Sequence, residues 1–396
     1  MTVELIATDK HEAQAHTIAL LNPARGELDR LWKRGRDFLG TELAVMGGAM
    51  TWVSERNLVA AISNAGGFGV IASGSMSPDL LDKEIAATAA LTVRPFGVNL
   101  ITMHPQLLEL IDVCLARSIG HVVLAGGLPP SAAIARIRDG GARAVCFAPA
   151  LVIARKLVRS GAEAIVIEGN EAGGHVGPVS TAVLAQEVLP HISEVPVFVA
   201  GGIGRGEAIL SYLEMGAAGV QLGTRFVCAH ESIAHTNFKR AFIRAAARDA
   251  VPSVQLDVRF PVIPVRALAN PATERFAAVQ RAVIERFARG ELSQKDAQLE
   301  IEHFWAGALR KAVIDGDIES GSLMAGQSVG MVAREQSTAF GRALESSRLS
   351  EAKRHDVIAV MSAVLDENLR SWQLGLQPVG AVATAIDRAA ELILGR

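Results

Sequence analysis

Residues 164–177 read AIVIEGNEAGGHVG, and this stretch decides the fold class of the chain. Its first half is apolar and rich in branched side chains, as is typical of a parallel strand buried on both faces. Its second half is a polar loop with four glycines and one histidine, His175. Imidazole has an ordinary pKa near neutrality, which suits it to proton transfer. The stretch therefore predicts a buried strand that leads into an active-site loop.

Seven similar apolar runs lie before and after this strand, and amphipathic stretches separate them. The eight predicted strands span residues 43–46, 68–72, 96–100, 121–125, 144–147, 164–168, 195–200 and 219–222. Apolar residues recur at helical spacing between them, for example over 105–116, 131–138, 151–159 and 207–215. Strands that alternate with helices must be parallel, because each connection crosses over the sheet. Eight such units predict a closed (β/α)8 TIM barrel of the α/β class, with an open doubly wound sheet as the alternative.

The flanking segments predict three regions. They are an N-terminal extension over 1–41, the barrel with its cofactor site over 42–230, and a mainly helical lid and C-terminal segment over 231–396. Beyond the eighth strand we expect a long basic helix over 230–247, an irregular proline-bearing connector over 251–271, and helices over 274–288 and 296–313. Residues 230–330 should then cover the mouth of the barrel, with the small residues of 321–327 closest to the site.

Composition limits the class of function. The chain has 396 residues, half of them hydrophobic, so it can bury a large core. A net charge of −2 offers no electrostatic attraction for nucleic acid or an anionic membrane. Cys114, Cys146 and Cys228 lie far apart, without metal-ligand spacing, and no apolar run reaches the ~20 residues that span a bilayer. We expect a cytoplasmic enzyme with a small-molecule substrate, no metal, no nucleic-acid partner and no membrane association.

Glycine marks six of the eight predicted strand ends, and the last two carry the clearest signal. Gly201 and Gly202 follow the seventh strand, while Gly223 and Thr224 follow the eighth. The loops after these strands are the usual phosphate site of a TIM barrel, because their backbone N–H groups can converge on an anion. The alternative is that these glycines only make tight turns. Together the two loops predict a phosphorylated cofactor.

Three polar side chains complete the predicted site. His175 is assigned to proton transfer, against the alternative of a structural histidine. Glu168 ends its strand and would point into an apolar barrel mouth, where a carboxylate needs a hydrogen-bond donor. Asn99 ends the third strand and offers a donor and an acceptor, either to a cofactor ring or between two loops. Glu171 is interpreted as solvated.

Taken in this order, the loops resemble those of the nitronate monooxygenase family, also called 2-nitropropane dioxygenase, and of its relative, the flavin-dependent enoyl-acyl carrier protein reductase. The matching motifs are AAISNAGGFG at 60–69, PFGVNL at 95–100, EGNEAGGHVG at 168–177, AGGI at 200–203 and VQLGTRF at 220–226. SLMAGQ at 322–327 resembles a C-terminal loop that approaches the flavin. The resemblance covers about residues 42–345, and the motifs are specific to the family as a set.

The resemblance implies a TIM barrel with non-covalent FMN, in which His175 is the catalytic acid or base. The residues that resemble flavin and phosphate contacts are Gly173, Gly174, Gly201, Gly202, Gln221, Gly223, Thr224 and Gln327. The residues that resemble contacts to the flavin ring are Gly47, Gly48, Ala49, Met50, Asn99 and Glu168. The first loop lacks the Gln or Pro that usually precedes its glycines, and residues 1–40 have no counterpart in the family pattern.

Two activities fit this resemblance. The first is an FMN-dependent nitronate monooxygenase, in which an alkyl nitronate reduces FMN and the reduced flavin reacts with O2. The second is an NAD(P)H-dependent enoyl-thioester reductase with acyl carrier protein as a partner, or another NAD(P)H-dependent flavin or quinone reductase. Glu168, Trp52 and residues 231–239 lean toward the reductase. A third class is a barrel that binds a phosphorylated ligand without redox chemistry, and we include a homodimer among the expectations.

Overall fold

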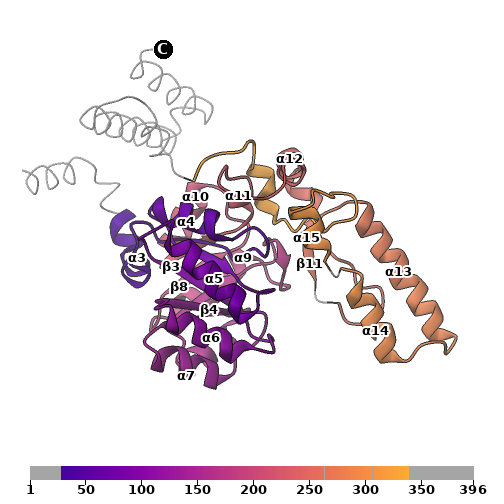
Figure 1. Cartoon of the computed structure of the whole chain (residues 1–396), viewed down its shortest axis with the longest axis horizontal. Helices are drawn as coiled ribbons and strands as arrows, with labels where there is room; N and C mark the ends of the chain where they lie inside the picture. Colours follow the sequence, from indigo (N-terminus) through magenta and orange to yellow (C-terminus); the bar gives the residue numbers. More distant parts are fainter. Residues whose placement is uncertain (1–27, 263, 306, 339–396) are drawn as a thin grey trace, which may run out of the picture. The chain divides into compact units, whose positions relative to one another are not determined.

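Eight parallel strands curl into a barrel in the computed structural model, which describes residues 28–262, 264–305 and 307–338 (Figure 1). The strands are β1 (Val45–Gly47), β2 (Gly69–Ala72), β3 (Phe96–Ile101), β4 (His121–Ala125), β5 (Arg143–Phe147), β6 (Ala164–Glu168), β8 (Val197–Ala200) and β9 (Gly219–Leu222). Their order in the sheet is β1-β9-β8-β6-β5-β4-β3-β2. Met46 also bridges to Phe68, just before β2, so the two edges of the sheet meet. The predicted TIM barrel is confirmed, and the open sheet is excluded.

Alternation along each strand builds two layers of core, because successive side chains point to opposite faces. The layer inside the barrel contains Met46, Phe68, Val70, Val123, Val145, Val166 and Phe198. The layer between the strands and the surrounding helices contains neighbours of these residues in sequence, such as Ile71, Leu124, Cys146 and Ile167. Both faces of each strand are therefore apolar, which explains why the strands stand out in the sequence as continuous hydrophobic runs.

Helices follow the strands and surround the barrel (Figure 1). They are α4 (Arg56–Asn64), α5 (Pro78–Ala89), α6 (Leu107–Ala116), α7 (Ser131–Asp139), α8 (Leu151–Arg159), α9 (Thr181–Val188), α10 (Gly206–Glu214) and the short α11 (Thr224–Val227). The predicted helices agree with these bounds to within two residues. The start of α5 shows a local cause: the Ser77 hydroxyl accepts from the backbone N–H of Leu80, and Pro78 takes the first helical position.

The helix α3 (Lys33–Leu39) closes the amino-terminal end of the barrel. Its Phe38 and Leu39 are buried in the same cluster as the barrel interior. His121, the first residue of β4, lies between the rings of Phe38 and Phe68 at centroid distances of 5.1 and 5.0 Å. Its Nε2 is 2.8 Å from the carbonyl oxygen of Phe38. This part of the predicted extension therefore belongs to the barrel core.

Two helix predictions beyond the barrel are wrong in extent. The expected long helix over 230–247 is only α12 (Thr236–Arg244), because the His235 side chain caps its start and Ala245 is already extended. The expected helix over 296–313 is two helices, α14 (Gln294–His303) and α15 (Ala308–Val313). Gly307 directly precedes α15 with φ +71°, a left-handed conformation that cannot continue an α-helix and favours glycine.

The predicted irregular connector over 251–271 contains two strands that the sequence analysis missed. β10 (Ala250–Pro252) pairs antiparallel with β11 (Val265–Leu268), and β11 pairs antiparallel with β7 (Gly174–His175). These strands are too short for a periodic signal. The predicted helix over 274–288 is confirmed as α13 (Pro271–Ala288), which packs beside α14 through buried Phe276, Val283 and Ile301 (Figure 1).

Residues 29–338 form one compact unit that holds the barrel and the segment after it. The division at residues 41 and 230 stays a prediction, as do the cytoplasmic location and the homodimer. Residues 1–27 and 339–396, the remainder of the predicted terminal regions, lie outside the described residues. Among the helices of the described part, none is long and apolar enough to cross a membrane.

Candidate functional site

The loop that carries His175 is held in place as a strand. His175 lies opposite Val265 in the β7–β11 pair, and the N–H of Val176 donates to the carbonyl of Pro264 at 3.0 Å. At the start of the loop, the N–H of Gly169 donates to the carbonyl of Ala200 at 3.1 Å. The histidine is thus tied to the barrel on one side and to the appended segment on the other.

The imidazole of His175 is exposed and forms no hydrogen bond with any of the residues described. Surrounding protein atoms nevertheless remove part of its hydration, and this desolvation lowers the pKa of His175. The ring is therefore neutral at pH 7, and a ring nitrogen is free to accept a proton.

Glu168 ends β6 as predicted, and its carboxyl group lacks a hydrogen-bond partner within the described ranges. Burial raises the pKa of Glu168 to about 7. Burying a carboxyl group without a hydrogen-bond partner costs free energy, and a ligand that supplies a hydrogen bond would offset this cost. At neutral pH the protonated carboxyl can donate and the ionised one can accept, so the residue fits a polar edge of a bound molecule.

The ends of β8 and β9 form the arrangement expected of a phosphate site. Ala200 is in register with Gln221, so the two loops that follow start side by side. The backbone N–H groups of Gly201, Gly202, Gly223 and Thr224 donate to no acceptor in the described part of the chain. Gly201 and Gly202 have φ values of +96° and +71°, which favour glycine. These unpaired donors fit an anion such as a phosphate.

Residues 322–327 lie against two of these loops. The N–H of Gly326 donates to Thr224 Oγ1 at 2.8 Å, and the N–H of Gln327 donates to the carbonyl of Glu171 at 2.9 Å. A Cβ atom on Gly173 would lie 2.6 Å from the backbone nitrogen of Gly326, so the approach requires glycine. The Thr224 hydroxyl therefore anchors this segment, and its own hydrogen remains available to a ligand.

Gln327 opens the short helix η3 (Gln327–Met331), and its half-buried amide has no hydrogen-bond partner among the residues described. The predicted position of residues 322–327 at the site loops agrees with these contacts. A contact between Gln327 and a flavin stays a prediction.

Glu171 is not a solvated loop residue, which corrects the sequence interpretation. Its Oε2 accepts hydrogen bonds from the N–H and the hydroxyl of Thr181, at 2.8 and 2.9 Å, at the start of α9. It also lies beside Gly202, where an added Cβ would be 3.0 Å from the Glu171 Cβ. The sequence offered no signal for this cap, because ten residues separate Glu171 from the helix that it caps.

The first loop, residues 47–50, lies beside the loop after β9. The N–H of Gly48 donates to the carbonyl of Leu222 at 2.8 Å, and a Cβ on Gly48 would lie 3.2 Å from the Cα of Gly223. A Cβ on Gly223 would in turn lie 3.6 Å from the sulfur of Met50. Ala49 packs at the end of the core inside the barrel.

The remaining predicted residues lie within strands. Asn99 does not end the third strand as predicted, because Leu100 and Ile101 still pair with β4 and β3 continues to Ile101. Asn99 is buried, and its Nδ2 donates to the carbonyl of Val123 at 3.3 Å, while its Oδ1 has no partner in the described residues. Gln221 is buried, and its amide has no partner among those residues either. Gly174, with φ +79°, approaches Met324. Amide groups without a partner among the described residues are suited to a ring or polyol with its own polar groups.

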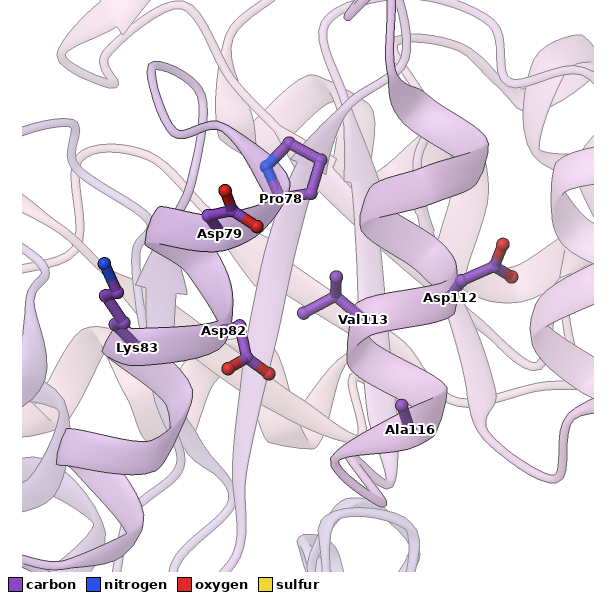
Figure 2. Close-up of a pocket in the computed structure, with 7 residues that line it drawn as sticks. All are labelled: Pro78, Asp79, Asp82, Lys83, Asp112, Val113 and Ala116. Carbon is purple, nitrogen blue, oxygen red and sulfur yellow. The ribbon is translucent and has the colours of Figure 1, made fainter.

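A groove on the outer wall of the barrel is separate from this site. It is lined by Pro78, Asp79, Asp82 and Lys83 of α5 and by Asp112, Val113 and Ala116 of α6, and Figure 2 shows Asp82 and Val113 pointing into the space between the two helices. None of the predicted site residues lines the groove. Asp82 pairs with Arg117 and Asp112 pairs with Arg136, so two of the acidic groups there already have partners.

A barrel that brings unpaired backbone donors and a neutral histidine to the carboxyl ends of its strands is typical of enzymes that hold a phosphorylated cofactor. A model of the nitronate monooxygenase family matches residues 33–114 and 106–339. The chain belongs to the nitronate monooxygenase family, and it is a flavin-dependent oxidoreductase.

Comparison with individual proteins gives relatives of several activities. The chain is 33% identical over 248 residues to (3aS,4S,5R,7aS)-5-hydroxy-7a-methyl-1-oxo-octahydro-1H-indene-4-carboxyl-CoA dehydrogenase of Mycobacterium tuberculosis, a match that covers 62% of this chain and 68% of the relative. It is similar in structure to FabK of Thermotoga maritima, with 32% identity, a TM-score of 0.70 and coverage of 86% of this chain and 98% of FabK. Nitroalkane oxidase of Streptomyces ansochromogenes follows at 29% identity, a TM-score of 0.62 and coverage of 77% and 94%.

Proposed function

We propose that this chain is an FMN-dependent oxidoreductase that exchanges hydrogen with the α and β carbons of an acyl thioester. The observation that carries the proposal is the imidazole of His175, which is neutral and has no hydrogen-bond partner in the described part of the chain, since neutral imidazole is a base that can remove a proton from carbon. The thioester class is supported by the carboxyl-CoA dehydrogenase and FabK, which have higher identity than nitroalkane oxidase.

The residues present fit FMN. Its phosphate would bind the N–H groups of Gly201, Gly202, Gly223 and Thr224, which have no acceptor within the described ranges. The edge of its ring would meet the carboxyl group of Glu168, and the contacts expected for the rest of the cofactor are residues 47–50, Asn99, Gly173, Gly174, Gln221 and Gln327. When bound, FMN supplies the acceptor or donor for the hydride.

His175 would handle the proton. In the oxidative direction its ring nitrogen takes the proton from Cα of the thioester, while the hydride leaves from Cβ. The single bond between Cα and Cβ thereby becomes a double bond. In the reverse direction the imidazolium returns the proton to Cα while Cβ receives the hydride. The same residue serves both directions, and acid–base assistance of this kind is worth about 100- to 10,000-fold in rate.

Nitronate oxidation is the second candidate, favoured by the family match and by the similarity to nitroalkane oxidase. In this function an alkyl nitronate reduces the flavin, and O2 reoxidises it. His175 would then hydrogen-bond the nitro oxygens or take a proton from the carbon of a nitroalkane.

Rapid mixing without oxygen separates the candidates. The purified flavoprotein is mixed separately with propane-2-nitronate, butyryl-CoA, NADH and NADPH, and loss of the oxidised-flavin absorbance is followed. The reduced protein is then mixed with crotonyl-CoA or with O2. We expect butyryl-CoA or a nicotinamide to reduce the flavin, and crotonyl-CoA to reoxidise it. Fast reduction by the nitronate, with no response to either thioester, would reject the thioester proposal and support the monooxygenase.

The same assay tests the partner and the co-substrate. If acyl carrier protein is the physiological carrier, crotonyl-acyl carrier protein should reoxidise the flavin faster than crotonyl-CoA at equal concentration. Equal rates would show that the chain recognises only the acyl group and the thioester.

A further inference from the structure

Arg266 occupies an unusual position beside the His175 loop. It lies on β11 opposite Gly174, next to the pair formed by Val265 and His175, and is only 7% exposed. Its Nε donates to the carbonyl oxygen of Asn170 at 2.8 Å, and its Nη1 donates to the carbonyl oxygen of Ala250. One guanidinium group therefore joins the loop after β6 to β10.

The charge of Arg266 makes this arrangement costly. The side chain forms no ion pair with the described residues, although Glu171 is close enough to favour the charged form. Burial lowers the pKa of Arg266, which reflects the loss of hydration around the charge. A buried guanidinium bonded only to carbonyl groups contributes less to stability than a well-packed apolar residue can. Its benefit must come from the geometry that it imposes.

The backbone of Arg266 adds a second link. Its carbonyl oxygen accepts from the N–H of Ala325 at 3.3 Å, within the segment 322–327 that lies against the site loops. The side chain thus holds residue 170, the strand pairing holds residues 174 and 175, and the backbone holds residue 325. Arg266 thus links the loop after β6, the β7–β11 pair and the segment 322–327.

We infer that Arg266 is a positioning residue that holds the imidazole of His175 at its working distance from the substrate. This inference rests on the proposed role of His175. Because displacement of a reacting group by about 1 Å costs roughly 100-fold in rate, loss of the two side-chain bonds should slow the proton-dependent step by about 10- to 100-fold.

The test compares four variants of the full-length flavoprotein: Arg266→Met, Arg266→Lys, His175→Ala and the double variant His175→Ala/Arg266→Met. Arg275→Met is the matched control, since Arg275 also donates to a distant backbone carbonyl, that of Glu319, but lies on α13. For each protein we measure flavin content, the thermal midpoint, and the pH profile of flavin reduction by butyryl-CoA and by propane-2-nitronate. Arg266→Lys retains the charge and provides the readout if Arg266→Met does not fold.

We expect Arg266→Met to keep its flavin, to lose about 10- to 100-fold in rate and to shift the pH profile. In the His175→Ala background the same change should alter the rate by less than about two-fold, because coupled residues are not additive. Arg275→Met should stay within about two-fold of wild type. A wild-type rate in His175→Ala overturns both the role of His175 and this inference. The inference about Arg266 alone is overturned if His175→Ala is slow while both Arg266 variants keep the wild-type rate. It is also overturned if the losses of the two single variants are additive in the double variant.

Discussion

Glu168 and His121 should give the flavin-free protein two opposing dependences of stability on pH. Burial raises the pKa of Glu168 to about 7 from an ordinary value of 4.5. Burial lowers the pKa of His121 to about 4 from an ordinary value of 6.5. Glu168 lies at the carboxyl end of the barrel and His121 at the amino end, so the two groups titrate independently. We expect Glu168→Gln to show the pH dependence of stability that His121 causes. His121→Asn should show the pH dependence that Glu168 causes.

The signs follow from which state binds more protons. For Glu168 the folded state holds its proton more tightly, so its stabilising contribution is full below pH 4.5 and is lost as the pH rises through about 7. For His121 the unfolded state binds the proton more tightly, so its contribution is full above pH 6.5 and is lost as the pH falls through about 4. Each change is worth about 3 kcal/mol, because one unit of pKa corresponds to about 1.4 kcal/mol.

Between pH 4.5 and 6.5 the fall of the Glu168 contribution with pH nearly cancels the rise of the His121 contribution, so their sum in the wild type stays nearly constant. The measurement is urea unfolding of flavin-free wild type, Glu168→Gln and His121→Asn at half-unit steps from pH 4 to 8.5. Relative to wild type, Glu168→Gln should gain about 3 kcal/mol of unfolding free energy between pH 4.5 and 7. His121→Asn loses packing at every pH, but its difference from wild type should shrink by about 3 kcal/mol as the pH falls from 6.5 to 4.

Parallel curves for wild type and Glu168→Gln would refute the assignment of a desolvated, unpaired carboxyl to the barrel mouth. The same experiment with saturating FMN supplies a functional control. If the flavin gives Glu168 its missing hydrogen-bond partner, the advantage of Glu168→Gln at high pH should decrease or reverse, as is common for residues that trade stability for function.

Three further predictions concern the cofactor and the chemistry. Gly202→Asp should purify with little flavin, because φ +71° is strained for aspartate, its Cβ would crowd Glu171, and its charge would repel the phosphate; full flavin content would place the phosphate elsewhere. His175→Ala should keep its flavin but lose about 100- to 10,000-fold in turnover, measured as the rate of flavin reduction at saturating substrate; a wild-type rate would make the histidine structural. Gln327→Ala should change the flavin spectrum or the KM with an unchanged thermal midpoint, and an unaltered spectrum, affinity and rate would separate this residue from the flavin.

Local patterns in the sequence were sufficient for the barrel. Residues 121–125 and 164–168 were predicted with the bounds that the structure has, because strands buried on both faces are continuous apolar runs and need no distant partner to be recognised. The helix predictions over 230–247 and 296–313 were too long, since their ends depend on His235 and Gly307 acting in a folded context.

The candidate site likewise has features that the sequence predicts and features that it does not. Order along the chain places His175, Glu168 and the glycines after β8 and β9 at one rim, because parallel strands of a barrel all end on the same side. Order along the chain does not predict the hydrogen bond from Arg266 to the carbonyl of Asn170, 96 residues away in sequence. Nor does it predict the hydrogen bond between Thr224 and Gly326, which are 102 residues apart. A hydrogen bond between residues so far apart has no periodic signature.

The sequence by itself therefore determined the barrel, the rim on which the site lies and the family to which its loops are similar. These follow from alternation and periodicity, which act over a few residues and survive in a single sequence. The tertiary structure alone decided that α3 closes the barrel, that β7 pairs with β11 and that Glu168 has no partner among the described residues. These properties depend on which distant groups meet and on which of them exclude water, and long-range packing determines both.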